Sequence, residues 1–153
     1  MLGAFKEVKV ICFSTFDAKK HFKDTNKINL LCVASHYTGD PTDNTVKFYE
    51  WVQAQTGKPL SKMRYALFGL GDSSYENYQA VGRYFDTTFV KLGATRLAPK
   101  GEGNSQYQKT EGQFDEWKKG LWKSLINFYP SIEFRPKVEE QSDSPMVRLE
   151  FSD

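Results

Sequence analysis

The sequence predicts a doubly wound α/β fold, in which a parallel sheet lies between two layers of helices. Apolar runs typical of buried strands alternate along the chain with segments of helical spacing. Polar, glycine-containing stretches directly follow two of these runs. The chain has 153 residues, of which 39% are hydrophobic, so it is long enough for one compact domain with its own core.

Four apolar runs are predicted to be strands. They span residues 8–13, 28–35, 63–70 and, more weakly, 94–98. The second and third runs lack a clean alternation of apolar and polar residues, which is typical of strands that are covered on both faces. These two runs are therefore expected to be strands with helices on both sides.

The segments between the runs show helical spacing. Val46, Tyr49 and Val52 form an apolar stripe, and Gly57 is placed to end that helix. A second stripe over residues 81–92 is followed by Gly93. A third stripe consists of Phe114, Trp117, Leu121 and Leu125. We assign all three stripes to core packing.

Composition excludes several classes of function. The formal net charge is only +2, from 21 basic and 19 acidic side chains, so no nucleic-acid or anionic-membrane surface is expected. No apolar window is long enough to span a bilayer, and we expect a cytoplasmic location. Cys12 and Cys32 lie in apolar runs without metal-ligand spacing, so both are predicted to be small buried residues, and no metal site is expected.

Two loops carry the residues that suggest chemistry. In a doubly wound sheet, ligands bind beyond the carboxyl ends of the strands. Aromatic side chains can stack on a flat, electron-accepting ring while neighbouring backbone groups contact its polar edge. The candidate residues follow the second and third runs: Ser35, His36, Tyr37, Thr38, Gly39, Leu70, Gly71, Asp72, Tyr75, Asn77 and Tyr78.

A succession of motifs makes a family resemblance specific. GDPTDN, FYEWVQ, ALFGLGDSSYENY, LGATRLAPKGEGN and FDEWKKGLW occur in this order. Residues 8–129 resemble the flavodoxin-like FMN domain of the diflavin reductases. The resemblance implies FMN as the cofactor, with Tyr75 against one face of its ring and Leu70 to Asp72 along its edge. It also places Asn77 and Tyr78 near the ring and ribityl chain, and Asn104 where the family usually has an aspartate.

The loop after the second run departs from the family pattern. The family commonly has Thr-Tyr-Gly where this chain has Ser35, His36 and Tyr37. Either His36 stacks on the flavin, or the loop shifts so that Tyr37 does; an exposed loop without a ligand is the third reading. No residue is predicted to act as a catalytic acid or base, because the cofactor carries the chemistry in flavin electron transfer.

The resemblance implies an electron-transfer role within a larger protein. In that family, an FAD/NADPH reductase domain of the same chain reduces FMN, and FMN reduces a haem protein. The fragment is not expected to turn over alone, and the parent protein could be anchored at the endoplasmic reticulum. Two alternatives stay open: the flavodoxin-like portion of a tRNA-modifying enzyme of the wybutosine pathway, and a degenerate interaction module that binds no flavin.

The domain is expected to occupy residues 1–129, with a linker and the start of a following domain in residues 130–153. Residues 1–7 match only the end of the family's first helix, so the first strand, its phosphate-binding loop and most of that helix have no counterpart. We therefore expect weakened FMN affinity, since such loops bind phosphate. We also expect residues 8–13 to pair directly with residues 28–35, or the exposed strands to form a homo-oligomer.

Overall fold

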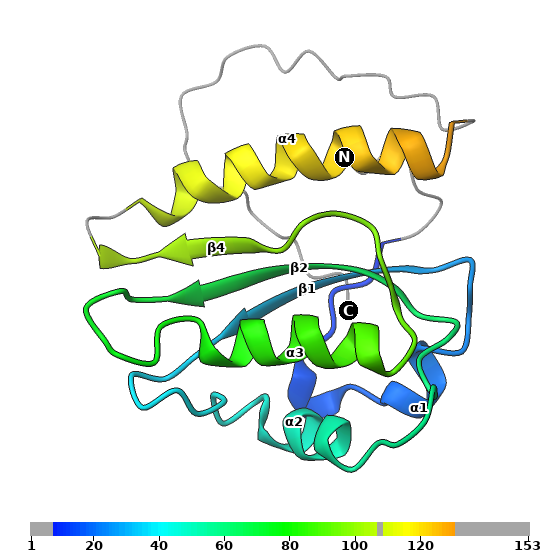
Figure 1. Cartoon of the computed structure of the whole chain (residues 1–153), viewed down its shortest axis with the longest axis horizontal. Coiled ribbons are helices and arrows are strands. Elements are labelled where there is room, and N and C mark those ends of the chain that lie inside the picture. The colour runs from blue at the N-terminus through cyan, green and yellow to red at the C-terminus, as the bar shows by residue number, and fades with distance from the viewer. Residues whose placement is uncertain (1–7, 107–108, 131–153) are drawn as a thin grey trace.

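The computed structural model describes residues 8–106 and 109–130. Strands and helices alternate along these residues, which confirms the predicted α/β class (Figure 1). The elements are η2 (Phe13–Thr15), α1 (Ala18–His21), β1 (Ile28–Ala34), α2 (Val46–Gln53), β2 (Arg64–Gly71), α3 (Ala80–Lys91), β3 (Thr95–Arg96), β4 (Gly101–Asn104) and α4 (Thr110–Phe128).

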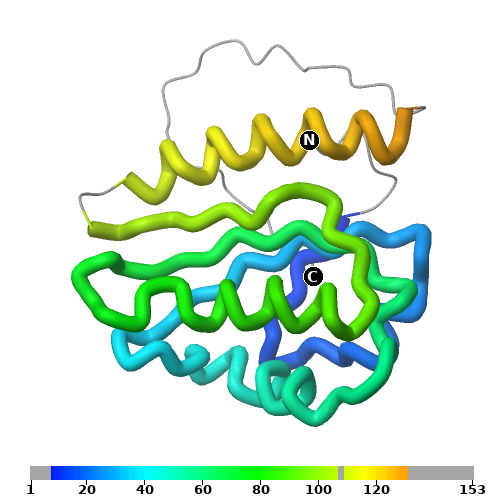
Figure 2. The backbone as a smooth tube through the Cα atoms, viewed as in Figure 1, coloured from blue at the N-terminus to red at the C-terminus, as the bar shows by residue number. Residues whose placement is uncertain are grey.

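The sheet is parallel and is built around β2. β1 pairs with β2 along its whole length, from Ile28 opposite Arg64 to Ala34 opposite Leu70. On the other edge of β2, β3 pairs with its beginning and β4 with its carboxyl half. Helices α2 and α3 lie on one side of the sheet and α4 on the other (Figures 1 and 2). The three-layer architecture is therefore as predicted.

The core consists of two apolar clusters, one on each face of β2. Tyr65 and Leu67 belong to the cluster beneath α2 and α3. Ala66 belongs to the cluster beneath α4, together with Leu121 and Leu125. All of these side chains are buried, which confirms the expectation that the run over residues 63–70 is covered on both faces.

A polar cluster fixes α3 to the beginning of the sheet. The Tyr65 hydroxyl donates to Asp86 Oδ1 at 2.8 Å, and Arg96 donates from Nε and Nη2 to the same carboxylate at 2.8 and 2.7 Å. Burial raises the pKa of the Tyr65 hydroxyl well above its ordinary value. The cluster joins β2, α3 and β3.

The helices begin and end close to the predicted positions. α3 ends just before Gly93, whose φ of 96° is readily adopted by glycine. α2 ends at Gln53, four residues before Gly57, and a turn fills the gap. The short helix α1 was not predicted; the side chain of Asp17 caps it by accepting a hydrogen bond from the Lys20 amide.

The prediction of a strand over residues 8–13 is wrong. Residues 8–12 have no regular structure, and η2 begins at Phe13. Val8 and Val10 are more than half exposed. Within the described residues β1 pairs only with β2, so the expected pairing of residues 8–13 with residues 28–35 is also wrong. Phe13 instead stacks on Phe48 with ring centroids 5.0 Å apart, which directs this segment toward α2 rather than along the sheet.

The prediction that the two cysteines are buried is also wrong, because both are exposed. Cys12 lies in the segment that fails to join the sheet. Cys32 lies on the same face of β1 as Leu30, which is 45% exposed, whereas Leu31 and Val33 on the opposite face are buried. β1 is therefore not covered on both faces as expected, since α4 packs on β2 and β4.

The predicted strand over residues 94–98 is present only as Thr95–Arg96, and β4 was not predicted. The ladder along this edge of β2 is interrupted at residues 97–100, where Pro99 has no N–H to donate. It resumes at Gly101, whose Cβ position would lie 2.4 Å from the Phe68 ring. Only glycine allows that close approach, so a strand forms from residues with low strand propensity.

Of the predicted linker and following domain, residues 131–153 lie outside the described residues. Among the residues that are described, no helix combines the length and the apolar character needed to cross a bilayer. The same residues contain no group of three or more His, Cys, Asp or Glu side chains arranged to hold a metal ion.

Candidate functional site

A cavity of about 410 Å³ lies at the carboxyl ends of the strands, which are at the left in Figure 1. The loops after β1 and β2 form two of its walls, and they lie side by side in Figures 1 and 2. The lining residues are Ala34, Ser35, His36, Tyr37, Leu70, Gly71, Asp72, Tyr75, Asn77, Tyr78, Gln79, Ser105 and Thr110. The two loops that the sequence singled out therefore meet at one cavity.

The loop after β1 is held by its own backbone. The His36 amide donates to the Asp40 carbonyl at 2.9 Å, and the Gly39 amide donates to the His36 carbonyl at 2.8 Å. Gly39 has a φ of 90°, and a Cβ there would lie 2.7 Å from the Cβ of Asn77. The Asn77 side chain donates to the Thr38 carbonyl at 2.9 Å. Thr38 and Gly39 therefore join the two loops and do not line the cavity.

The rings of Tyr37 and Tyr75, which both line the cavity, are in contact. Their ring centroids are 5.2 Å apart, and the rings are inclined by 42°. The His36 ring lies behind Tyr37, with centroids 5.8 Å apart. Of the two alternatives for the second stacking residue, the structure brings Tyr37, not His36, into contact with Tyr75.

The spacing of these rings restricts how a flat ligand can enter. Two aromatic faces that sandwich a planar ring need centroids about 7 Å apart, twice the ordinary carbon–carbon contact distance. The observed 5.2 Å is too short. Tyr37 is 62% exposed and Tyr75 is 45% exposed, so solvent borders both rings. A flat ligand must therefore separate the two rings before it can be enclosed by both.

The tip of β2 forms the base of the cavity. The Gly71 carbonyl accepts a hydrogen bond from the Ser105 amide at 2.9 Å, which continues the contact with β4. A Cβ at Gly71 would lie 3.1 Å from the Tyr78 ring, so glycine allows this ring to approach the backbone closely. The Asp72 carboxylate accepts from the Ser74 hydroxyl and amide, and these bonds lower the pKa of Asp72.

Asn104, which the family resemblance implies to lie near the ribityl chain, is the last residue of β4. It is not among the lining residues. Its Oδ1 accepts from the amides of Ser73 and Gln106, both at 3.1 Å, and its Nδ2 donates to the Ser73 hydroxyl at 2.7 Å. The Asn104 side chain therefore fixes the loop after β2 to the end of β4.

Four lining residues were not predicted: Ala34, Gln79, Ser105 and Thr110. Ala34 is the last residue of β1 and could have been included from the strand boundary. Ser105 follows β4, which was itself missed. Gln79 has a left-handed backbone with a φ of 61°, a conformation that costs about 1 to 2 kcal/mol in a residue other than glycine, and no pattern in the sequence indicates it.

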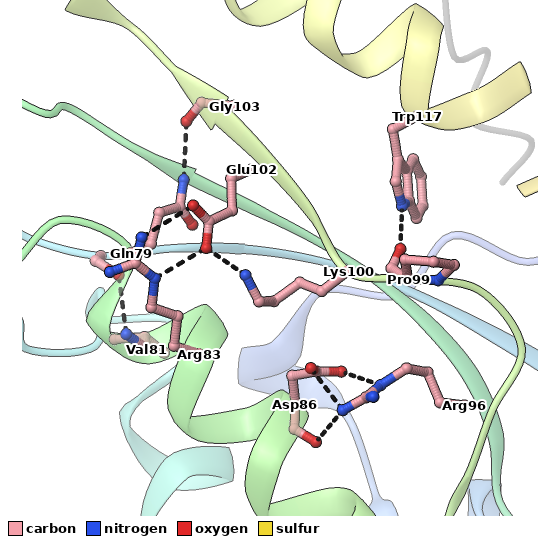
Figure 3. Close-up of polar contacts among 11 residues, drawn as sticks. Gln79, Val81, Arg83, Asp86, Arg96, Pro99, Lys100, Glu102, Gly103 and Trp117 are labelled. Atoms are coloured by element: carbon pink, nitrogen blue, oxygen red, sulfur yellow. Dashed lines mark hydrogen bonds and ion pairs between the residues drawn. The ribbon is translucent and has the colours of Figure 1, made fainter. Parts of the chain in front are cut away.

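Arg83, Glu102 and Lys100 form a charged cluster next to Tyr78. Arg83 lies 5.5 Å from the centroid of the Tyr78 ring and donates to both carboxylate oxygens of Glu102, at 2.9 and 3.0 Å (Figure 3). Lys100 also donates to Glu102. The hydrogen bonds from Arg83, followed by those from Lys100, lower the pKa of Glu102 to about 2. The cluster connects α3 to β4.

A parallel, doubly wound sheet with a cavity lined by aromatic side chains at its strand tips is typical of the flavodoxin-like class of α/β proteins. The flavodoxin family profile matches residues 2–117, and the chain belongs to this family.

Relatives and solved structures agree with that assignment. NADPH–cytochrome P450 reductase of Aspergillus niger is 39% identical over 110 residues, which cover 65% of this chain and 16% of that protein. The Cavia porcellus protein of the same name is 36% identical over 104 residues, which cover 68% of this chain and 15% of that protein. The chain thus spans about a sixth of the length of these relatives. The predicted resemblance to the FMN domain of diflavin reductases is confirmed.

Among solved structures, a short-chain flavodoxin associated with a bacterial microcompartment has a TM-score of 0.55 and 25% identity, covering 73% of this chain and 74% of that chain. A flavodoxin from Streptococcus pneumonia has a TM-score of 0.55 and 20% identity, covering 72% and 73%. These similarities confirm the flavodoxin-like fold.

Proposed function

We propose that this chain is an FMN-binding electron-transfer domain. In this proposal, an FAD/NADPH reductase domain of the parent protein reduces it, and it reduces a haem protein such as a cytochrome P450. The observation that carries the proposal is the contact between Tyr37 and Tyr75 at the tips of adjacent parallel strands. Membership of the flavodoxin family and the similarity to reductases support it.

The residues of the cavity fit a flavin. A cavity of about 410 Å³ suits a planar tricyclic ring once the exposed rings of Tyr37 and Tyr75 have separated. A side chain at Gly71 would occupy space beside Tyr78, so the glycine keeps the backbone of residues 70–72 open to a ligand edge. Tyr37 and Tyr75 would hold the faces of the ring, and the tip of β2 would hold its edge. The bound flavin would supply the one- and two-electron chemistry.

The chain would position the flavin ring and exclude water from it. Tyr37 and Tyr75 would cover the ring, and the rigid attachment of Asn77 to the Thr38 carbonyl would keep the two loops together. A fixed aromatic environment restricts the orientation of the ring, which sets how close its edge can come to a partner's redox centre. The identity of that partner depends on the parent protein.

We propose that the affinity for FMN is weak in this chain. No Lys or Arg occurs among the described residues that line the cavity. Such a lining offers the phosphate no ion pair, and one hydrogen bond between a cationic side chain and a phosphate contributes about 1.5 to 3 kcal/mol, so affinity for FMN is lowered. FMN and riboflavin, which differ by the phosphate, should therefore bind with similar affinity. A clear preference for FMN would contradict this part of the proposal.

A titration tests the proposed function. Adding the chain to FMN should quench flavin fluorescence, because the isoalloxazine ring stacks on tyrosine. Tyr75→Ala removes the ring and should weaken binding by roughly 10-fold, since one aromatic stacking contact contributes about 1 to 3 kcal/mol. Tyr75→Phe keeps the ring and should bind like the wild type. Equal affinity of wild type and Tyr75→Ala would refute the assignment of the slot.

A strand-mediated homo-oligomer is a second proposal on partners. The outer edge of β1 has no strand beside it within the described residues, and its sequence, INLLCVA, contains no charge or proline to discourage pairing. Leu30 adds exposed apolar surface next to that edge. Light scattering after size exclusion should detect dimers that dissociate on dilution. A monomer at all concentrations would contradict this proposal and leave the flavin assignment unaffected.

A further inference from the structure

Gln79 has an unusual backbone conformation at the start of α3. It is the one residue other than glycine with a positive φ among the described residues, with φ 61° and ψ 16°. Glycine is the residue that adopts this region without steric conflict. Gln79 is also the N-cap of α3, yet its side chain makes no capping hydrogen bond. The side chain therefore does not serve to begin the helix.

The Gln79 amide is buried between β2, α3 and β4. Nε2 donates to the Gly103 carbonyl at 2.9 Å (Figure 3), whereas Oε1 has no hydrogen-bond partner in the described part of the chain. A Cβ at Gly69 would lie 2.0 Å from Oε1, and one at Gly82 would lie 3.4 Å from it. Gly69 thus makes room for this amide, which connects the start of α3 to β4.

The same residue ends the loop that carries Tyr75 and Tyr78. Its backbone nitrogen lies 3.4 Å from the position that a Cβ of Gly71 would take, so the chain passes directly over the base of the cavity. Gln79 lies in the turn that joins this loop to α3. Its amide therefore anchors the end of the loop that carries Tyr75 to β4.

We propose that Gln79 is a positioning residue for the flavin slot. Its buried amide holds the loop over residues 72–78 against β2 and β4, and so sets the distance of Tyr75 from Tyr37. The inference rests on the proposed flavin-binding function. A glutamine with only a structural role would change the unfolding midpoint, whereas a positioning residue changes the flavin affinity of a chain that is fully folded.

Three variants separate the effect of the left-handed backbone at Gln79 from the effect of its side-chain amide. Gln79→Asn keeps a residue that tolerates a left-handed backbone, but its amide is one methylene shorter and does not reach the Gly103 carbonyl. Gln79→Gly removes the side chain and the backbone strain. Gly69→Ala leaves Gln79 in place but puts a methyl group 2.0 Å from Oε1, which displaces the amide. Gly112→Ala, at a position with no atom near its Cβ, is the matched control.

The experiment measures two properties of each chain under conditions where unfolding curves show it to be folded. The first is the dissociation constant for FMN from fluorescence quenching. The second is amide hydrogen exchange over residues 72–78 without flavin, where the Tyr75 and Tyr78 amides are bonded within the loop. Gln79→Asn, Gln79→Gly and Gly69→Ala should each raise the dissociation constant about tenfold or more and accelerate exchange in the loop.

A combined variant sharpens the test. If both substitutions act through the Gln79 side-chain amide, their effects should not add. The double variant Gln79→Gly/Gly69→Ala should then bind FMN no more weakly than the single variant with the lower affinity. The inference is overturned if Gln79→Asn and Gly69→Ala match the wild type and Gly112→Ala in affinity and exchange. If the wild type itself does not quench FMN, the proposed function fails, and unchanged exchange in the variants would then overturn the positioning role as well.

Discussion

The Glu102 cluster allows a stability prediction whose size can be worked out. Glu102 lies on β4 and accepts two hydrogen bonds from Arg83 and one from Lys100. The fall of the Glu102 pKa from an ordinary 4.5 to about 2 corresponds to at most about 3 kcal/mol. The Arg83 side chain is 55% exposed, so solvent screening reduces this to about 1 to 2 kcal/mol.

The pH dependence has a definite sign. A carboxyl group whose pKa is lower in the folded state contributes its full stabilisation above its unfolded pKa. For Glu102 that stabilisation should be complete above about pH 5 and should be lost as the pH falls from 4.5 toward 2. Glu102→Gln should therefore be less stable than the wild type at pH 7, and the difference should shrink at pH 3.

Urea unfolding at the two pH values measures this difference. The matched control is Glu116→Gln, because the pair of Glu116 with Lys119 has side chains 73% and 67% exposed and its removal should leave the midpoint unchanged. Equal midpoints for Glu102→Gln and the wild type at pH 7 would refute the reasoning. A difference of the same size at pH 7 and pH 3 would refute its electrostatic origin.

Three further predictions concern packing and the partly buried ion pair of Asp86 with Arg96. Gly101→Ala puts a methyl group 2.4 Å from the Phe68 ring and should lower stability by about 1 to 3 kcal/mol, seen as a lower urea midpoint. Gly112→Ala lies inside α4 with open space around it and should raise stability by up to about 1 kcal/mol in the same assay. Asp86→Asn removes the negative charge that accepts two hydrogen bonds from Arg96, and it should lower the free energy of unfolding by about 2 kcal/mol. An unchanged urea midpoint would contradict this pairing.

The central strand and the helices could be predicted because local pattern and tertiary environment agree there. The apolar run around Tyr65 and Leu67 is buried on both faces, and Gly93 follows α3 with the positive φ that such an end favours. The segment over residues 8–13 has an equally apolar sequence, but a strand also needs a partner edge. Phe13 packs on Phe48 instead, and no local pattern predicts that choice.

The candidate site was predictable where residues directly follow a strand. Tyr37 and Tyr75 lie at the cavity because parallel strands bring their carboxyl ends to one edge. Sequence alone left the choice between His36 and Tyr37 open, because it depends on the exact path of the loop. Gln79 could not be found, since its proposed role arises from a left-handed backbone and from space that the distant Gly69 provides.

The central claim is that Tyr37 and Tyr75 form the two faces of a flavin slot. Nuclear Overhauser effects between FMN and the chain measure this directly. We expect contacts from the isoalloxazine ring protons to the ring protons of both Tyr37 and Tyr75, and none to Tyr49, which packs on Tyr84 with centroids 4.7 Å apart. A quenched, bound flavin that shows contacts to neither Tyr37 nor Tyr75 would contradict it.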